Sequence, residues 1–276
     1  MQAAEQLVRE GKLDDALATL QDAIRKDPSN AKLRIFLFQL LCVRGDWDRA
    51  QNQLGVAKEL DAGAVLMAQV CSQAIQCERL REGVFSGKRT PLVFGEPAAW
   101  VGQLVQANKL LAEGHHDHAA QLRDQAFEDA PAISGTVNGE PFEWIADADV
   151  RLGPMFEALI EGKYYWVPMT AVAKLEIDEP ADLRDVVWAP GTFTFTNGGT
   201  AIALLPVRYP GSEASDDDAI RLARKTDFAE PAENTYLGVG QRMWATDAGE
   251  YAMLATRELI LGDGPPEIVE PEPSDG

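Results

Sequence analysis

A recurring pattern of small residues constrains this chain more than any other feature. Gly11 begins a pattern that Gly45 repeats 34 residues later and Gly114 repeats 69 residues after that. A 34-residue period with glycine and alanine at fixed offsets is typical of tetratricopeptide-like helix pairs, which stack into scaffolds that bind other proteins. The first question about function is therefore which protein the chain binds. The other members of the pattern are Ala16, Leu20, Ala23 and Pro28 in the first copy, Ala50, Leu54 and Ala57 in the second, and Ala119, Ala126 and Pro131 in the third.

The apolar spacing predicts helices through most of the region before the last proline of the pattern. Apolar residues three and four apart predict helix pairs over residues 1 to about 60, and a weaker periodicity predicts helix over 63–83. Prolines and glycines predict a loop over residues 84–97, and residues 100–131 have the pattern of a last helix pair. The long interval before Gly114 leaves room for one degenerate repeat, so we expect the stacking to depart from a regular array there.

After Pro131 the pattern becomes that of a strand-rich domain. Aromatic and β-branched residues become dense, and their period approaches two, which is typical of strands. Asn197-Gly198-Gly199 predicts a hairpin turn, because Asn and Gly tolerate positive φ. Residues 150–161 and 216–225 are predicted to be helices. The predicted strands are Tyr164–Met169, Val172–Ile177, Val186–Trp188, Thr192–Thr196 and Thr200–Val207, then a final pair over Tyr236–Thr246 and Tyr251–Leu261 that turns at Asp247-Ala248-Gly249.

These patterns predict an α+β multidomain protein with three parts. Residues 1–132 form a tetratricopeptide-like helical repeat domain, and residues 133–262 form a β-rich α+β domain, for which a small barrel is one arrangement. Residues 263–276 contain five acidic residues, four prolines and no basic residue. We expect this acidic tail to be disordered, because it has too little apolar surface to offset the entropy of ordering.

The charge distribution excludes some classes of partner. The formal net charge is −19, and residues 133–276 carry 10 basic against 26 acidic residues. An acidic surface repels phosphate backbones and anionic lipids, so nucleic acid and membrane are not expected partners, whereas a basic or amphipathic protein segment is. No apolar run is long enough to span a bilayer, and residues 1–10 lack a signal-peptide core. With three cysteines at no metal-binding spacing, these features predict a cytoplasmic protein.

Two clusters of polar residues have both a chemical and a structural interpretation. His115, His116 and His118 carry imidazoles that suit zinc or nickel, but they fall in the turn of a repeat and point in different directions. We therefore expect no metal site. Asp147 and Asp149, with Glu157, could divide general acid and base roles in a hydrolase. The alternative is that an aspartate caps a helix near Arg151 and that Arg151 and Arg184 pair with carboxylates inside the domain.

Several phrases in the second half resemble one family in their order and spacing. Phe142–Pro154, Tyr164–Pro168, Asp182–Asp185, Trp188, Arg208–Glu213 and Gly238–Met243 resemble the ImpE/TagJ/SciE family of bacterial type VI secretion accessory proteins. The resemblance covers nearly the whole chain, because that family also begins with tetratricopeptide-like helices. It implies a cytoplasmic, non-enzymatic protein without a cofactor.

The resemblance also implies a partner. Family members bind a helical segment of the small contractile-sheath subunit, and they influence sheath handling together with the AAA+ ATPase that disassembles the sheath. A hydrolase built on the three carboxylates, or a tetratricopeptide adaptor unrelated to secretion, are the alternatives. The candidate protein-binding residues are Trp144, Asp147, Asp149, Arg151, Tyr165, Trp166, Arg184, Arg208, Tyr209, Gln241 and Arg242.

Overall fold

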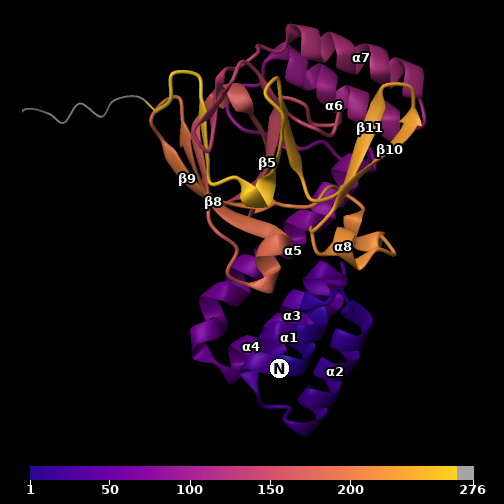
Figure 1. Ribbon diagram of the computed structural model, residues 1–276, viewed down its shortest axis with the longest axis vertical. Coiled ribbons are helices and arrows are strands. Elements are labelled where there is room, and N and C mark those ends of the chain that lie inside the picture. The colour runs from indigo at the N-terminus through magenta and orange to yellow at the C-terminus, as the bar shows by residue number, and fades with distance from the viewer. Residues whose placement is uncertain (266–276) are drawn as a thin grey trace, which may run out of the picture.

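The computed structural model describes residues 1–265, and it begins with a stack of helices (Figure 1). The acidic tail predicted over 263–276 lies, from residue 266 onward, outside the described residues. Helices dominate the first half of the chain and strands dominate the second, so the predicted fold class is confirmed. The first five helices are α1 (Gln2–Arg9), α2 (Leu13–Lys26), α3 (Ala31–Val43), α4 (Trp47–Leu60) and α5 (Val65–Phe85).

The repeated glycines mark the turns between paired helices, as the period predicted. Gly11 follows α1, Gly45 follows α3 and Gly114 follows α6 (Ala99–Ala112), with φ angles of 71°, 70° and 83°. This left-handed conformation ends a helix at little cost for glycine alone, because glycine has no Cβ. After Gly114 the chain enters α7 (His116–Asp129).

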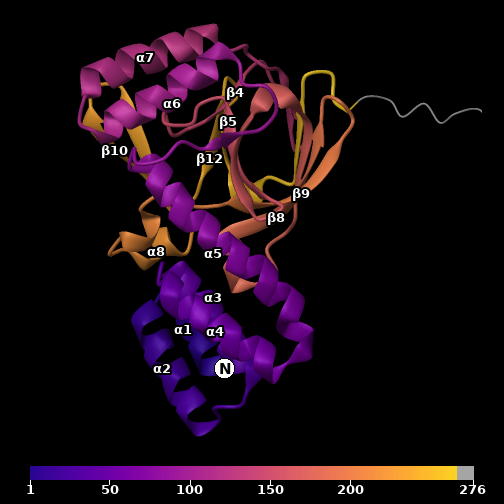
Figure 2. The ribbon, with the colours of Figure 1, turned by 180° about the vertical axis from the view of Figure 1, so that it is seen from behind.

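The third helix pair lies apart from the first two. The long helix α5 runs from the α1–α4 stack toward α6 and α7, which lie at the other end of the molecule beside the strand-rich part (Figure 2). The expected departure from a regular array is therefore confirmed, and it takes the form of this long helix. Between α5 and α6, the predicted loop contains a short strand, β1 (Leu92–Val93), that pairs parallel with β6.

The strand-rich part is built on a nine-stranded sheet. The strand order is β1-β6-β5-β9-β8-β7-β14-β2-β3, so the sheet runs from β1 at one edge to β3 at the other and is not a closed barrel in the described residues. A three-stranded sheet (β13-β12-β4) and the hairpin β10-β11 complete the domain. The strands are β2 (Gly135–Val137), β3 (Glu140–Phe142), β4 (Ile145–Asp147), β5 (Met155–Ile160), β6 (Lys163–Pro168), β7 (Val172–Ile177), β8 (Trp188–Phe195), β9 (Thr200–Pro206), β10 (Thr226–Ala232), β11 (Thr235–Gly240), β12 (Met243–Thr246), β13 (Glu250–Ala252) and β14 (Glu258–Leu261).

Several local predictions were wrong. The helix predicted over 150–161 is a turn followed by β5, whose six side chains are all buried, so its sequence lacks the alternation that identifies a half-exposed strand. The strand predicted over Val186–Trp188 is the end of a 3-10 helix (Leu183–Val186) and the first residue of β8. The final strand pair is four strands, of which β12 and β13 form the hairpin across the predicted turn.

One apolar core joins the helices to the sheet. It contains Leu41 of α3 and Ile75 of α5 together with Trp166 of β6 and Trp188 of β8. Trp47 of α4 stacks on Trp188 with ring centroids 5.8 Å apart. The division of the chain at residue 132 stays a prediction, because this core extends across it.

Two further sequence features concern cysteines and membranes. Cys42, Cys71 and Cys77 are free and buried, and all three are small core residues. Among the helices of residues 1–265, none combines the length and the hydrophobicity that a membrane span needs.

Candidate functional site

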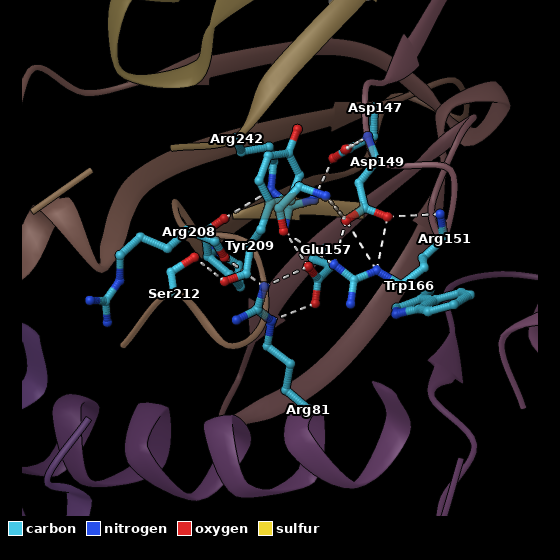
Figure 3. A network of polar contacts seen from close by, with 12 residues as sticks. Arg81, Asp147, Asp149, Arg151, Glu157, Trp166, Arg208, Tyr209, Ser212 and Arg242 are labelled. Carbon is cyan, nitrogen blue, oxygen red and sulfur yellow. Dashed lines mark hydrogen bonds and ion pairs between the residues drawn. The ribbon is translucent and has the colours of Figure 1, made fainter. Parts of the chain in front are cut away.

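A buried ionic cluster lies where α5 meets the sheet (Figure 3). At its centre is Glu157 of β5, whose side chain is fully enclosed. Arg81 of α5 donates from Nε to Oε1 of Glu157 at 2.7 Å and from Nη2 to Oε2 at 3.0 Å. The same Nη2 donates to the carbonyl oxygen of Arg208 at 2.7 Å. Because a two-point pair fixes the orientation of both partners, this contact locks α5 to β5.

A second arginine binds the same carboxylate from the other side. Arg242 donates from separate Nη atoms to Glu157 and to Asp147, and its Nε donates to the carbonyl oxygen of Pro206 at 3.1 Å. The Tyr164 hydroxyl also donates to Glu157, and it accepts a hydrogen bond from a neighbouring tryptophan indole. All the acceptors of this buried carboxylate are thus occupied by donors within the protein.

Burial and ion pairing shift the pKa values of Glu157 and Asp147 in opposite directions. Burial favours the neutral form of Glu157, but Arg81 and Arg242 outweigh it and lower its pKa to about 2. For Asp147, burial outweighs the opposing effect of Arg242 and raises the pKa to about 6. The cluster therefore contains one carboxylate that stays ionised and one that gains a proton just below neutral pH.

Asp149 holds the turn that leads into β5. Its Oδ1 accepts from the backbone N–H of Arg151 at 2.9 Å and from Nε of Arg151 at 2.9 Å. Its Oδ2 accepts from the backbone N–H of Gly238 at 2.9 Å. The predicted aspartate cap is therefore a turn contact rather than a helix cap, whereas the predicted pairing of Arg151 with a carboxylate is confirmed.

Arg208 connects the strand-rich domain to the helical stack. Its guanidinium donates to the carbonyl oxygens of Val43 at 2.6 Å and Cys42 at 3.2 Å, which are the last residues of α3. Such carbonyls have no partner within the helix, and a cation there also interacts favourably with the helix dipole. At the adjacent turn, a Cβ added to Gly45 would lie 2.5 Å from Cγ of Glu213. The end of α3 is thus fitted closely against the domain.

The structure places most of the predicted protein-binding residues in the interior. Trp144 is exposed (41%), whereas Tyr165, Arg151, Arg184 and Gln241 are half-buried. In this conformation the buried side chains are out of reach of a partner, and their polar groups bind other parts of the chain. The buried side chains are Asp147, Asp149, Trp166, Arg208, Tyr209 and Arg242.

The geometry bears on both the hydrolase interpretation of the carboxylates and the metal-site interpretation of the histidines. A hydrolase needs its carboxylates to converge in an open pocket. Asp147, Asp149 and Glu157 are instead buried and bound by arginines or backbone amides, which is the arrangement of an ionic scaffold. Within residues 1–265, no three His, Cys, Asp or Glu side chains gather at metal-binding spacing, and His116 and His118 lie in the first turn of α7.

The surface offers an apolar groove between α5 and the sheet. Its volume is about 300 Å³, and exposed Val70 of α5 and Ile202 of β9 lie on its walls. Ile202 is 82% exposed, and Leu66, one turn before Val70 on α5, is 72% exposed. Neighbouring apolar side chains as exposed as these are typical of interaction sites. The groove is also lined by Gln73, Ala74, Leu159, Glu161, Gly162, Pro190, Ala203 and Leu204.

Sequence reasoning missed α5 as the element that organises both the cluster and the groove. One signal was present, because Glu78 and Arg81 fall on the same helical face as the buried Ala74 and Cys77. Charged residues on an apolar helix face indicate a buried pair. Glu78 accepts from the indole Nε1 of Trp188 at 2.7 Å. No comparable signal identifies the sheet residues of the groove, since their position depends on tertiary packing.

The fold and the ionic cluster define a class of protein, a scaffold in which tetratricopeptide-like helices are locked to a strand-rich domain. A tetratricopeptide repeat model matches residues 7–73, and a model of the ImpE protein family matches residues 139–260. The type VI secretion system accessory component TagJ of Pseudomonas aeruginosa is 53% identical over 256 residues, which are 93% of this chain and 90% of that protein. The chain therefore belongs to the ImpE/TagJ family.

A solved structure has the same fold. The crystal structure of a Vibrio parahaemolyticus protein superimposes with a TM-score of 0.85 at 28% sequence identity. The match covers 94% of this chain and 97% of that one. The relation therefore extends over both the helical stack and the strand-rich domain.

Proposed function

We propose that this chain is a non-enzymatic accessory protein of a type VI secretion system that binds a helical segment of the small contractile-sheath subunit. The observation that carries the proposal is the 53% identity to TagJ over 93% of the chain. Through this contact the chain influences sheath handling, with an indirect link to the AAA+ ATPase that disassembles the sheath. We place the chain in the cytoplasm, as the family resemblance implies.

The apolar groove is the seat that we propose for the bound helix. An amphipathic helix binds by laying apolar side chains, three and four residues apart, into such a groove. Leu66 and Val70 lie one turn apart on α5, and Ile202 faces the groove from β9. Burying these side chains under a partner removes apolar surface from water, which favours association by about 25 cal/mol per Å². Their present exposure supports the proposal.

Trp144 is a second proposed contact. It is the exposed member of the candidate residues, and its ring combines large apolar area with a hydrogen-bond donor. The two backbone amides of Glu143 and Trp144 bind Oδ1 of Asp247 at 2.7 Å and 3.3 Å, so the tryptophan is held on an anchored backbone. An anchored backbone has less conformational entropy to lose on binding.

The test is calorimetric titration of the purified chain with the purified small sheath subunit. We expect saturable binding to the wild type and at least a tenfold loss of affinity for Ile202→Asp, since the variant places a charge against apolar anchors. Tyr236→Asp is the matched control, because Tyr236 is an exposed apolar residue on the β10–β11 hairpin, outside the groove. Trp144→Ala tests the second contact separately. Absence of binding to the wild type contradicts the proposed function.

A further inference from the structure

A cation-lined cleft lies at the end of α5, beyond the apolar groove. Two adjoining cavities of about 460 and 290 Å³ share Val84, Arg89, Thr90 and Pro91 in their walls. Neither cavity is lined by an aspartate or a glutamate. The basic side chains in their walls are Lys88, Arg89, Lys109 and Lys163.

This local charge is opposite to that of the whole chain. The protein has 44 acidic against 25 basic residues, yet four basic residues meet at this cleft. Three of them, Lys88, Arg89 and Lys163, have no ion pair within residues 1–265, and Lys109 makes a long contact of 3.9 Å with Glu113. Lys88, Arg89 and Lys163 are therefore free to bind an external anionic group.

The cleft and the apolar groove lie on opposite sides of one turn. Gly162, at the turn between β5 and β6, lines both the groove and the larger cavity, so the two depressions meet at this turn. The turn is fixed on α5, since a Cβ at Gly162 would lie 2.8 Å from the side chain of Gln73, and Sγ of Cys77 donates to the Gly162 carbonyl at 3.4 Å. The cleft also exposes Leu80 and Leu92, which continue the apolar surface.

The surface along α5 is long enough for a helix of several turns. From Leu66 to Val84 the helix extends about 27 Å at 1.5 Å per residue. The half near Leu66 is mainly apolar and includes one carboxylate, Glu161, whereas the half near Val84 combines apolar and polar side chains with four cations. A segment that follows α5 across the β5–β6 turn therefore meets two different surfaces in a fixed order.

Given the proposed function, we infer that the sheath segment carries acidic residues at one end of its apolar face, and that these residues bind the cations of the cleft. The bound segment then has one orientation, with its apolar anchors beside Ile202 and its acidic end beside Arg89 and Lys163. The overall charge of the chain favours a basic partner, but interactions beyond about 10 Å are screened at physiological salt. The cations in direct contact therefore decide the chemistry of the bound end.

The experiment compares two double variants with the same change in net charge. The double variant Arg89→Glu with Lys163→Glu reverses the charge of two side chains in the cleft. The double variant Arg25→Glu with Lys32→Glu reverses the charge of two exposed side chains on α2 and α3. Calorimetric titration with the small sheath subunit, at 50 mM and 500 mM NaCl, reports the affinities. We expect the cleft variant to bind at least tenfold more weakly at low salt, the control within twofold of the wild type, and the wild type to weaken at high salt.

The outcomes separate this inference from the proposed function. If the cleft variant binds like the control while Ile202→Asp abolishes binding, the sheath segment does not bind the cleft through acidic residues. The inference is then wrong, and the proposed function stands. If the wild type does not bind the subunit, the proposed function fails and the inference fails with it. Unchanged circular dichroism and melting temperature of each variant establish that a loss of affinity is not a loss of fold.

Discussion

Removing Arg242 should destabilise the protein more than removing any surface arginine. The side chain is 1% exposed and is the partner of Asp147, while it shares Glu157 with Arg81. In Arg242→Met at pH 7.5, the methionine fills similar volume, but Asp147 loses its counterion, so the buried group must either keep an unpaired charge or take up a proton. Breaking a buried pair in this way costs about 3–5 kcal/mol, and a typical domain has a total stability of about 5–15 kcal/mol.

Urea unfolding measures this cost, because buried Trp166, Trp188 and Trp244 report on the core by fluorescence. Arg25→Met is the control, since Arg25 is 70% exposed and its pair with Asp22 contributes less than about 1 kcal/mol. The additional substitution Asp147→Asn should recover part of the loss, because it removes the unpaired charge.

The pH dependence of the same cost provides a second check. Burial already raises the pKa of Asp147 to about 6, and the loss of Arg242 removes an effect that lowers it. A folded-state pKa above the unfolded value means that stability is lost as pH rises through the folded pKa. The cost of Arg242→Met should therefore be smaller at pH 5 than at pH 7.5. A cost equal to that of Arg25→Met at both pH values would refute the role assigned to the cluster.

Three other substitutions test separate parts of the structure. Gly45→Ala should lower the melting temperature more than Gly114→Ala. Both glycines have positive φ, but only at position 45 would the added Cβ meet Glu213, so equal shifts in melting temperature would contradict that close contact. Arg208→Met should speed amide hydrogen exchange at the end of α3, measured by mass spectrometry, since the guanidinium no longer binds the carbonyls of Val43 and Cys42. Unchanged exchange would contradict the link. In Asp147→Asn the free energy of unfolding should no longer fall as pH rises from about 4 to 6, because the group whose pKa is raised is gone; persistence of that slope would assign the proton to another group.

The helical half could be predicted well because its signals are local. The glycines of the repeat need positive φ, and the apolar spacing reports which side of each helix is buried. The same kind of signal located the hairpin at residues 197–199 between β8 and β9. These features depend on residues close together in the sequence, so a single sequence contains them.

The strand-rich half was less predictable because its determinants are distant in sequence. β5 is buried on both faces by neighbours from the sheet and from the helices, so its apolar run resembles a buried helix. Glu157 is paired with arginines 76 residues before it and 85 residues after it. A sequence supplies the two charges of such a pair but not their proximity.

The phrases that carry the family resemblance describe the junction more than the binding surface. Asp147, Arg208, Tyr209 and Arg242 belong to those phrases, and all four are buried where the helices meet the sheet. Their polar groups bind other parts of the chain, as a structural core requires. The apolar groove and the cation-lined cleft lie mainly outside these phrases, which explains why the sequence suggested the partner more readily than the surface.

The most direct test of helix binding in the apolar groove is hydrogen–deuterium exchange of the chain with and without the small sheath subunit. A helix seated in the groove should slow amide exchange in the first half of α5 and in β9, on either side of Val70 and Ile202. We expect protection of these two elements in the same complex. Protection confined to α1–α4, or no protection at saturating subunit, would contradict it.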